Sequence, residues 1–565
     1  MEQPEVYNTK EELIKWLEED LKEQRKNYFS YTENPVDEME LEDFLFINIG
    51  IIDTDCDKII IGDINNNCKK IINVNFKLNI QRIITDLTIR YKNTLDEEYS
   101  EKKKINYKIN CKGVIFNAYA DFSNADIREA DFSDVVFNKE VNFIKSKFYG
   151  KCKFTNTIFK EIADFSNTQF YYKNEHDKKF IHNSIYFYNN EFYKSLIFKN
   201  STFDLSVIID NSTFKSIVDF NNCIFNESLN ITNSKFKNHA NFKNSTFNIL
   251  KIEHVKFYRW ANFYCSNFKK IANIINVEFN EYTNFMNSIF EEADICYILK
   301  TDSNPMYNFA NSKINKKLSI YNIEKEYINI YLDNIKFENE YSIISIRNIE
   351  NPIRYLSFKD VIIRGIINIQ NVEVETADFK GSVINRGLVN PVNFKIDNFA
   401  NRESALFLKN EAYARRNVID ALKYKDKEME MHKKELLNKP NKTSKDWFDI
   451  ISISLSSLYS NNGQNWGKSL FMTILITFVF FNIFYLPDLS QSNIEPYFYK
   501  DYFSNLIKYF IPTDYEQIKY YADASVRVNI FIKIFGAIIY FVGKIMFWYG
   551  SVQTVQAFRK FSKGA

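Results

Sequence analysis

Large apolar residues recur along the middle of this chain at a spacing that neither an α-helix nor a β-strand produces. A helix returns to the same face every 3.6 residues and a strand every two. Here steps of five residues alternate with steps of six over long stretches. One such stretch runs Phe198, Phe203, Ile209, Phe214, Phe220 and Phe225. The alternation predicts many copies of one short unit, each returning a bulky side chain to a common core.

A smaller residue stands two positions before most of the large ones. Examples are Ala120-Asp121-Phe122 and Ala240-Asn241-Phe242. Residues i and i−2 share one face of an extended segment. Both side chains therefore point inward, and the bulky one fits because the other is small.

These phrases resemble the A(D/N)(L/F)xx unit of the pentapeptide-repeat family, and the resemblance covers roughly Cys111 to Ile384. It implies a mainly β fold, the right-handed quadrilateral β-helix, in which each unit forms one side of a square coil. Coils of roughly 20–22 residues should stack about 4.8 Å apart, the spacing of paired strands. We expect the six-residue steps to place an extra residue at alternate corners. The Asn or Asp beside the large residue is expected to satisfy backbone groups at the corners.

The flanking composition predicts four segments. Residues 1–110 form an α/β capping segment with a helix in its first part, because a solenoid must cover its exposed core. Residues 111–390 form the β-helix. Residues 391–465 form a helical cap or linker, with one long charged helix from Arg402 to Leu437. Residues 466–565 form a membrane hairpin.

Two apolar segments of the hairpin are long enough to cross a bilayer, at about 470–487 and 530–555. Basic residues flank the outer ends of both segments, although the second segment itself contains Lys533 and Lys544, and the loop between the segments carries both signs of charge. By the positive-inside rule, both termini face the cytoplasm. The absence of a recognisable signal peptide agrees with that orientation. We therefore expect an integral protein of the bacterial cytoplasmic membrane.

Lys544 is the candidate functional residue within the membrane, because it lies near the middle of the second segment. A lysine at that depth costs a few kcal/mol unless it meets a partner, water or the interface. Structural pairing or snorkelling is favoured over a role in conduction. Gly536, Gly543 and Gly550 recur every seven residues and predict a face for close helix packing rather than a gate.

Composition argues against several classes of function. The net charge is +2, and residues 111–390 contain 34 basic and 32 acidic residues, so neither nucleic-acid binding nor mimicry of DNA is expected. The seven cysteines form no C-x-x-C pair. No nucleotide, zinc-protease or serine-hydrolase motif is present. We predict no catalytic, cofactor-binding or metal-binding residues.

The sequence favours a non-enzymatic, membrane-anchored scaffold whose β-helix binds a protein partner on the cytoplasmic side. The expected partners of the scaffold are the lipid bilayer and an unidentified protein. A homo-oligomer is expected only for the alternative function. That alternative is a subunit of an oligomeric channel or stress-responsive pore with a cytoplasmic β-helix as regulatory domain. A potassium-selective filter is not expected, since no glycine lies between Gly467 and Gly536.

Overall fold

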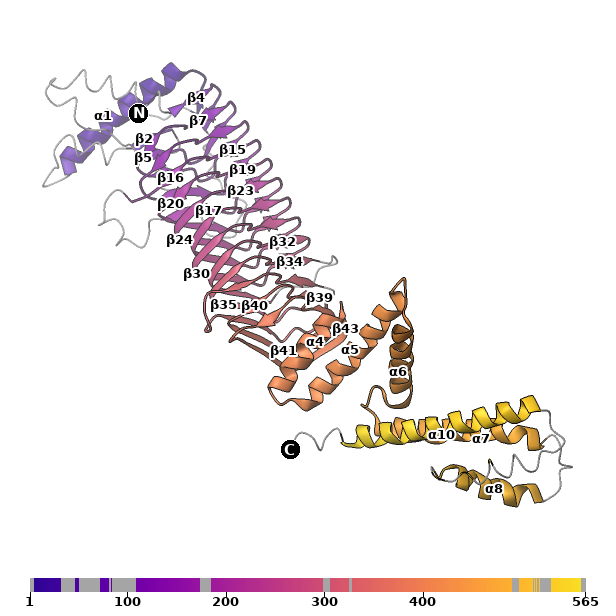
Figure 1. Ribbon diagram of the computed structural model, residues 1–565. Coiled ribbons are helices and arrows are strands. Elements are labelled where there is room, and N and C mark those ends of the chain that lie inside the picture. The colour runs from indigo at the N-terminus through magenta and orange to yellow at the C-terminus, as the bar shows by residue number, and fades with distance from the viewer. Residues whose placement is uncertain are drawn as a thin grey trace. The chain divides into compact units, whose positions relative to one another are not determined.

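The computed structural model describes residues 5–31, 46–49, 72–80, 83, 108–172, 184–297, 305–324, 328–489, 497–511, 513, 515, 518 and 530–559. The chain forms two compact units, Met1–Asp397 and Asn398–Ala565, and each is described by itself. The first is a parallel β-solenoid of about 12 turns, visible in Figure 1 as stacked arrows that follow helix α1 (Lys10–Tyr31). The mainly β solenoid predicted from the sequence is confirmed.

The strands form four columns, one for each side of the coil. One column is a ten-stranded sheet: β1 (Val6–Tyr7), β3 (Ile72–Val74), β6 (Val114–Phe116), β10 (Val136–Phe137), β14 (Ile158–Phe159), β18 (Glu191–Phe192), β22 (Thr213–Phe214), β25 (Lys235–Phe236), β28 (Lys256–Phe257) and β31 (Glu278–Phe279). The next side holds β4 (Leu78–Asn79), β7 (Ala120–Asp121), β11 (Val141–Asn142), β15 (Ala163–Asp164), β19 (Leu196–Ile197), β23 (Val218–Asp219), β26 (Ala240–Asn241), β29 (Ala261–Asn262), β32 (Tyr282–Asn284), β34 (Met306–Asn308), β36 (Asn329–Tyr331) and β39 (Ile353–Ser357).

The two remaining sides begin as separate short strands and then merge. The third side holds β8 (Asp126–Ile127), β12 (Lys147–Phe148), β16 (Gln169–Phe170) and β20 (Thr202–Phe203), and the fourth holds β2 (Phe46–Asn48), β5 (Lys108–Asn110), β9 (Ala130–Asp131), β13 (Cys152–Thr155), β17 (Ser184–Tyr188) and β21 (Ser206–Asp210). Longer strands then span both sides: β24 (Ile224–Thr232), β27 (Thr246–Glu253), β30 (Asn267–Ile275), β33 (Ile289–Cys296) and β35 (Lys313–Tyr321). The last coils contain β37 (Lys336–Phe337), β38 (Ile343–Arg347), β40 (Ile362–Ile363), β41 (Ile366–Asp378), β42 (Val383–Ile384) and β43 (Leu388–Phe399).

Stacking of equivalent residues creates the core. Phe220 is fully buried, and its ring lies parallel to those of Phe198 and Phe242 in the neighbouring coils, with centroids 5.0 and 5.3 Å apart. The small residue two positions earlier follows the same rule, since Val218 pairs with Ala240 and both are buried. The inward assignment made from the sequence is therefore confirmed at these positions.

Five-residue steps turn the chain sharply. At the step from Phe198 to Phe203, Asn200 adopts a φ of +59° and the Ser201 N–H donates to the Phe198 carbonyl. Residues with positive φ recur every eleven positions, at 200, 211, 222 and 233. Asn dominates these positions because its short polar side chain tolerates the left-handed region. The six-residue step that begins at Phe214 has three residues before the next inward one, Val218, whereas the five-residue step from Phe198 has two before Ser201, so the extra residue at the alternate corner is confirmed here.

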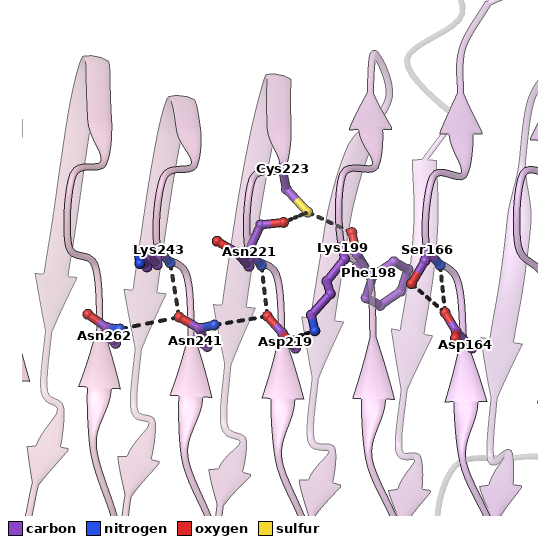
Figure 2. Close-up of polar contacts among 10 residues, drawn as sticks. All are labelled: Asp164, Ser166, Phe198, Lys199, Asp219, Asn221, Cys223, Asn241, Lys243 and Asn262. Carbon is purple, nitrogen blue, oxygen red and sulfur yellow. Dashed lines mark hydrogen bonds and ion pairs between the residues drawn. The ribbon is translucent and has the colours of Figure 1, made fainter.

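Asn and Asp beside the large residues serve the corner backbone, as expected (Figure 2). Asp219 Oδ1 accepts the Asn221 N–H at 3.0 Å and the Asn241 side-chain amide at 3.0 Å. Asn241 in turn accepts the Lys243 N–H at 3.2 Å. These Asn and Asp residues, here called the Asx column, link each corner to the coil beside it.

Buried hydroxyl groups form a second polar row. Ser245 is almost fully buried, and its hydroxyl donates to the Phe220 carbonyl of the preceding coil at 2.6 Å. Cys223 occupies the same position one coil earlier and directs its thiol to the Phe198 carbonyl at 2.8 Å (Figure 2). The row supplies a donor to carbonyls inside the solenoid that water cannot reach.

Helix α1 covers the first coil. It begins after a reciprocal cap, in which Thr9 Oγ1 accepts the Glu12 N–H and Glu12 accepts the N–H groups of Asn8 and Thr9. Leu13 and Leu17 lie on one face and are fully buried, and the helix packs against β1 and β2. This is where the sequence placed an N-terminal cap.

The second unit is helical in its described residues, with α4 (Arg402–Ala414), α5 (Val418–Asn438), α6 (Ser444–Ser460), α7 (Trp466–Leu489), α8 (Tyr497–Tyr509) and α10 (Ile530–Phe558). The prediction of one long helix from Arg402 to Leu437 is wrong. The helix breaks at residues 415–417, where Arg416 has a φ of +60° and Asn417 caps α5 through the Asp420 N–H. The break lets α4 fold back on α5, so that the buried Glu428 accepts hydrogen bonds from Arg402 and Lys409.

The ring ladder yields a stability prediction. We expect Phe220→Ala to lower the free energy of unfolding by about 3–5 kcal/mol, because it removes a buried ring and leaves a cavity between two stacked neighbours. Lys251→Ala is the control, since Lys251 is an outward, exposed residue of the same solenoid. Urea unfolding of the purified full-length protein, followed by circular dichroism, measures both. Equal stability of the two variants would contradict the ladder.

Candidate functional site around Lys544

Helices α7 and α10 are long and apolar enough to cross a membrane, over Trp466–Phe484 and Ile534–Phe558. They pack along each other and expose large apolar side chains to the outside, among them Phe471 of α7 and Ile545 of α10, which are 62% and 64% exposed. Water does not favour such a surface, whereas lipid does. The expected spans at about 470–487 and 530–555 fall within these two helices.

Helix α8 packs against both of these helices through a cluster of aromatic residues. Tyr509 and Tyr540 are fully buried, with ring centroids 5.3 Å apart, and Tyr509 also lies 5.5 Å from the ring of Phe481. The Tyr502 hydroxyl donates to Asn482 Oδ1 at 2.8 Å. The exposed Phe503 lies beside the docked face of α8, next to the exposed Ser504. Helix α8, the described part of the segment between the two spans, is therefore docked along one face and carries both apolar and polar residues on the rest of its surface.

Lys544 binds the C-terminal end of α8. Its side chain is only 3% exposed, and its ammonium donates to the carbonyls of Tyr509 and Ile511 at 2.8 and 2.7 Å. The same ammonium lies 4.8 Å from the ring centroid of Tyr509 and 5.5 Å from that of Tyr540. The last carbonyls of a helix lack partners within the helix and carry partial negative charge. The geometry therefore favours structural pairing, the reading that the sequence preferred.

Two of the three predicted glycines lie where helices approach closely. A Cβ added to Gly543 would collide with the Tyr509 hydroxyl and with Phe480 of α7. A Cβ added to Gly550 would collide with Thr473 and Tyr459. Gly536 is buried in the same helix. Gly543 thus makes room for the end of α8 beside Lys544, and Gly550 makes room for α7.

Small polar residues of α7 complete the helix interface, and sequence reasoning missed them. Ser469, Thr473 and Thr477 are buried, and the two threonines return their hydroxyls to carbonyls four residues earlier. Thr554 of α10 donates to Ser469 at 3.0 Å. The signal was a spacing of four between small polar residues inside an apolar run, which is typical of packed membrane helices.

A second lysine serves a helix end in the same manner. Lys468 of α7 donates to the Ser457 carbonyl and to Asn461 Oδ1 at 3.1 and 2.5 Å, where α6 ends. Helix α6 packs one side against α5 through Ile450 and Ile453. Another side of α6 exposes Trp447 and Ile451, which are 52% and 51% exposed and form an apolar surface.

The chemistry of the described residues is that of packing and hydrogen bonding. Within those residues, no group of three His, Cys, Asp or Glu side chains could hold a metal ion. Lys544 is a buried titratable residue of these helices, and it donates two hydrogen bonds to backbone carbonyls. The site can therefore hold one helix against two others.

Comparison with known families gives one match. Residues 198–246 match the family described as pentapeptide repeats (9 copies). These residues lie in the stacked coils described above, and the resemblance drawn from the repeat unit is confirmed. Neither the comparison with curated proteins nor that with solved structures gave a match.

The contact of Lys544 with α8 can be tested by Lys544→Met. This change keeps an apolar stem but removes the donor to the buried Tyr509 carbonyl, at a cost of about 1–3 kcal/mol, and the donor to the more exposed Ile511 carbonyl. We expect faster amide hydrogen exchange across residues 502–511 in nanodiscs. Ile545→Met, at the neighbouring exposed position, is the matched control and should leave exchange unchanged. Unchanged exchange in Lys544→Met would show that the aromatic cluster alone holds α8.

Proposed function

Because this chain carries pentapeptide repeats on a β-solenoid, we propose that it is a non-enzymatic, membrane-anchored scaffold whose solenoid binds a protein partner in the cytoplasm. The observation that carries the proposal is the pairing of two structural devices in one chain. One is a solenoid whose outward side chains lie in fixed columns, and the other is a pair of long helices that expose apolar side chains suited to contact with lipid. Solenoids offer extended surfaces for binding, and apolar helices hold such a surface at a membrane.

The outward side chains support binding rather than catalysis. The stacked coils hold them at fixed positions, with hydrogen bonds such as that from Asn241 to Asp219 joining one coil to the next. A surface preorganised in this way loses little conformational entropy when a partner binds. Enzymes instead need convergent titratable groups in an enclosed pocket.

A specific observation favours the alternative, an oligomeric channel subunit. Helix α8 is docked against both apolar helices, and Lys544 fixes its end near the middle of α10. A short helix held within the membrane between two spans is a suitable element for lining a pore. A pore would require several copies of the chain. In the described residues of a single copy, α7 and α10 pack directly against each other and leave no channel between them.

Measurements on the reconstituted protein distinguish the scaffold function from the channel function. We expect the purified full-length protein to pass no ions in a planar bilayer, because in a single copy Lys544 and the aromatic cluster are packed among helices rather than exposed to a channel. The oligomeric state in nanodiscs is measured on the same sample. Currents from a symmetric oligomer, reduced by Lys544→Met and retained in Ile545→Met, would favour the channel instead.

The proposed orientation predicts which positions are accessible to a membrane-impermeant maleimide. Ser492→Cys, in the loop between the spans, should label in intact cells, and Ser562→Cys, near the C-terminus, only after permeabilisation. Both sites lie outside the described residues. Labelling of Ser562→Cys in intact cells would place the C-terminus outside and rule out the proposed hairpin.

The background for this experiment follows from the burial of the native thiols. Cys111, Cys152, Cys223 and Cys296 are buried, and burial raises the pKa of each thiol, so little reactive thiolate forms. These four cysteines can remain. Only the exposed Cys265 and the two cysteines outside the described residues, Cys56 and Cys68, need replacement by serine.

A further inference from the structure

One wide corner of the solenoid displays aromatic and basic side chains in register. At each six-residue step, three consecutive residues lie between two inward ones, as Lys215, Ser216 and Ile217 lie between Phe214 and Val218. Five successive coils repeat this arrangement. We call the set the basic aromatic ridge, and it comprises residues 193–195, 215–217, 237–239, 258–260 and 280–282.

Backbone hydrogen bonds hold the ridge positions above one another. The Leu196 N–H donates to the Ile217 carbonyl at 3.0 Å, the Val218 N–H donates to the His239 carbonyl at 3.0 Å, and the Ala240 N–H donates to the Trp260 carbonyl at 2.9 Å. The alignment of the ridge is therefore a direct consequence of coil stacking.

Exposed aromatic residues cluster at the end of the ridge. Trp260 is 52% exposed, and its ring lies 5.5 Å from that of His239 and 5.9 Å from that of Tyr282. Tyr258 and Ile217 are 36% and 41% exposed. In two earlier coils the position of Trp260 is taken by Glu140 and Ser195, so the aromatic character is not required by the fold.

The ridge is also positively charged on a nearly neutral rod. It carries four basic residues and one acidic residue, which are Lys194, Lys215, Lys237, Arg259 and Glu281. Arg259 pairs with Glu281 at 2.5 Å, and Lys215 pairs at 3.0 Å with Glu191 beside the ridge. Lys194 and Lys237 are exposed.

We propose that the basic aromatic ridge binds an acidic segment of a partner protein. The inference rests on the scaffold function and names the surface and the chemistry of the partner. Exposed Trp, Tyr and Arg side chains contribute most strongly to binding energy at protein interfaces. Complementary charge selects an acidic partner and accelerates its association.

A protein segment fits this surface better than a nucleic acid. Single-stranded nucleic acids bind by stacking their bases on open ring faces along a basic track. Here the rings of His239, Trp260 and Tyr282 already contact one another edge to face from coil to coil. Two of the four basic residues are already paired with carboxylates, Arg259 with Glu281 and Lys215 with Glu191, so the ridge offers no continuous track of free cations for a phosphate backbone.

The test places a photo-cross-linking residue on the ridge of the full-length protein in its native membrane. Trp260→p-benzoylphenylalanine is compared with Tyr341→p-benzoylphenylalanine, because Tyr341 is 76% exposed and lies outside the ridge. The adducts are digested and their peptides identified by mass spectrometry. We expect a protein adduct at position 260 alone, through a segment in which Asp and Glu outnumber Lys and Arg.

Charge reversal provides the second arm. Lys194→Glu together with Lys237→Glu should lower the yield of the adduct at position 260 by about tenfold or more, since like charges then face each other. Lys251→Glu reverses an exposed charge outside the ridge and should leave the yield unchanged. An equal loss in both variants would overturn the role of ridge charge.

The remaining outcomes separate this inference from the scaffold function. A nuclease-sensitive adduct, a lipid adduct or a segment without acidic excess at position 260 would overturn the proposal. A protein adduct at position 341 but not at 260 would overturn the ridge while leaving the scaffold function in place. No protein adduct at either position would count against both.

Discussion

The parallel hydrogen bonding of one coil to the next is the constraint on which the solenoid depends. It places each residue directly above its equivalent, as Val218 is placed above Ala240. An inward Phe therefore continues a ring ladder, an outward Asn continues the Asx column, and a small hydroxyl residue continues the buried polar row. Each position in the repeat acquires one chemical role because the register does not drift.

Sequence reasoning recovered the features that this register repeats. The inward positions, the extra residue at alternate corners and the corner role of Asn and Asp all follow from many copies of one local rule. No repeated sequence pattern predicts the break between α4 and α5. Arg416 and Asn417 are ordinary residues in a charged helical pattern, and the break is set by the packing of α4 on α5 around Glu428. The docking of α8 was hidden for the same reason, because it depends on tertiary contacts of Tyr509 and Lys544.

The lysines of the apolar helices act through backbone groups. Lys544 and Lys468 each donate to a carbonyl at the end of a neighbouring helix, α8 in one case and α6 in the other. The Lys544 contact satisfies an ammonium removed from water and supplies a donor to a carbonyl at the end of α8, whereas Lys468 adds a second donor to the Ser457 carbonyl, which already accepts the Asn461 N–H. The sequence identified Lys544 by its cost in a membrane. It could not identify the partner, because every residue has a backbone carbonyl and the amino-acid type therefore does not show which carbonyl will accept.

The surface of the solenoid divides into positions that serve the fold and positions that are free to vary. Residues of the Asx column, such as Asp219, bond to their own corner and to the next coil, so their identity is tied to stability. The wide corners carry no equivalent requirement, because their outward side chains follow no left-handed turn and cap no strand. Glu140, Ser195 and Trp260 occupy equivalent wide-corner positions in different coils. The wide corners are therefore the places on this rod where the sequence can change without loss of the register.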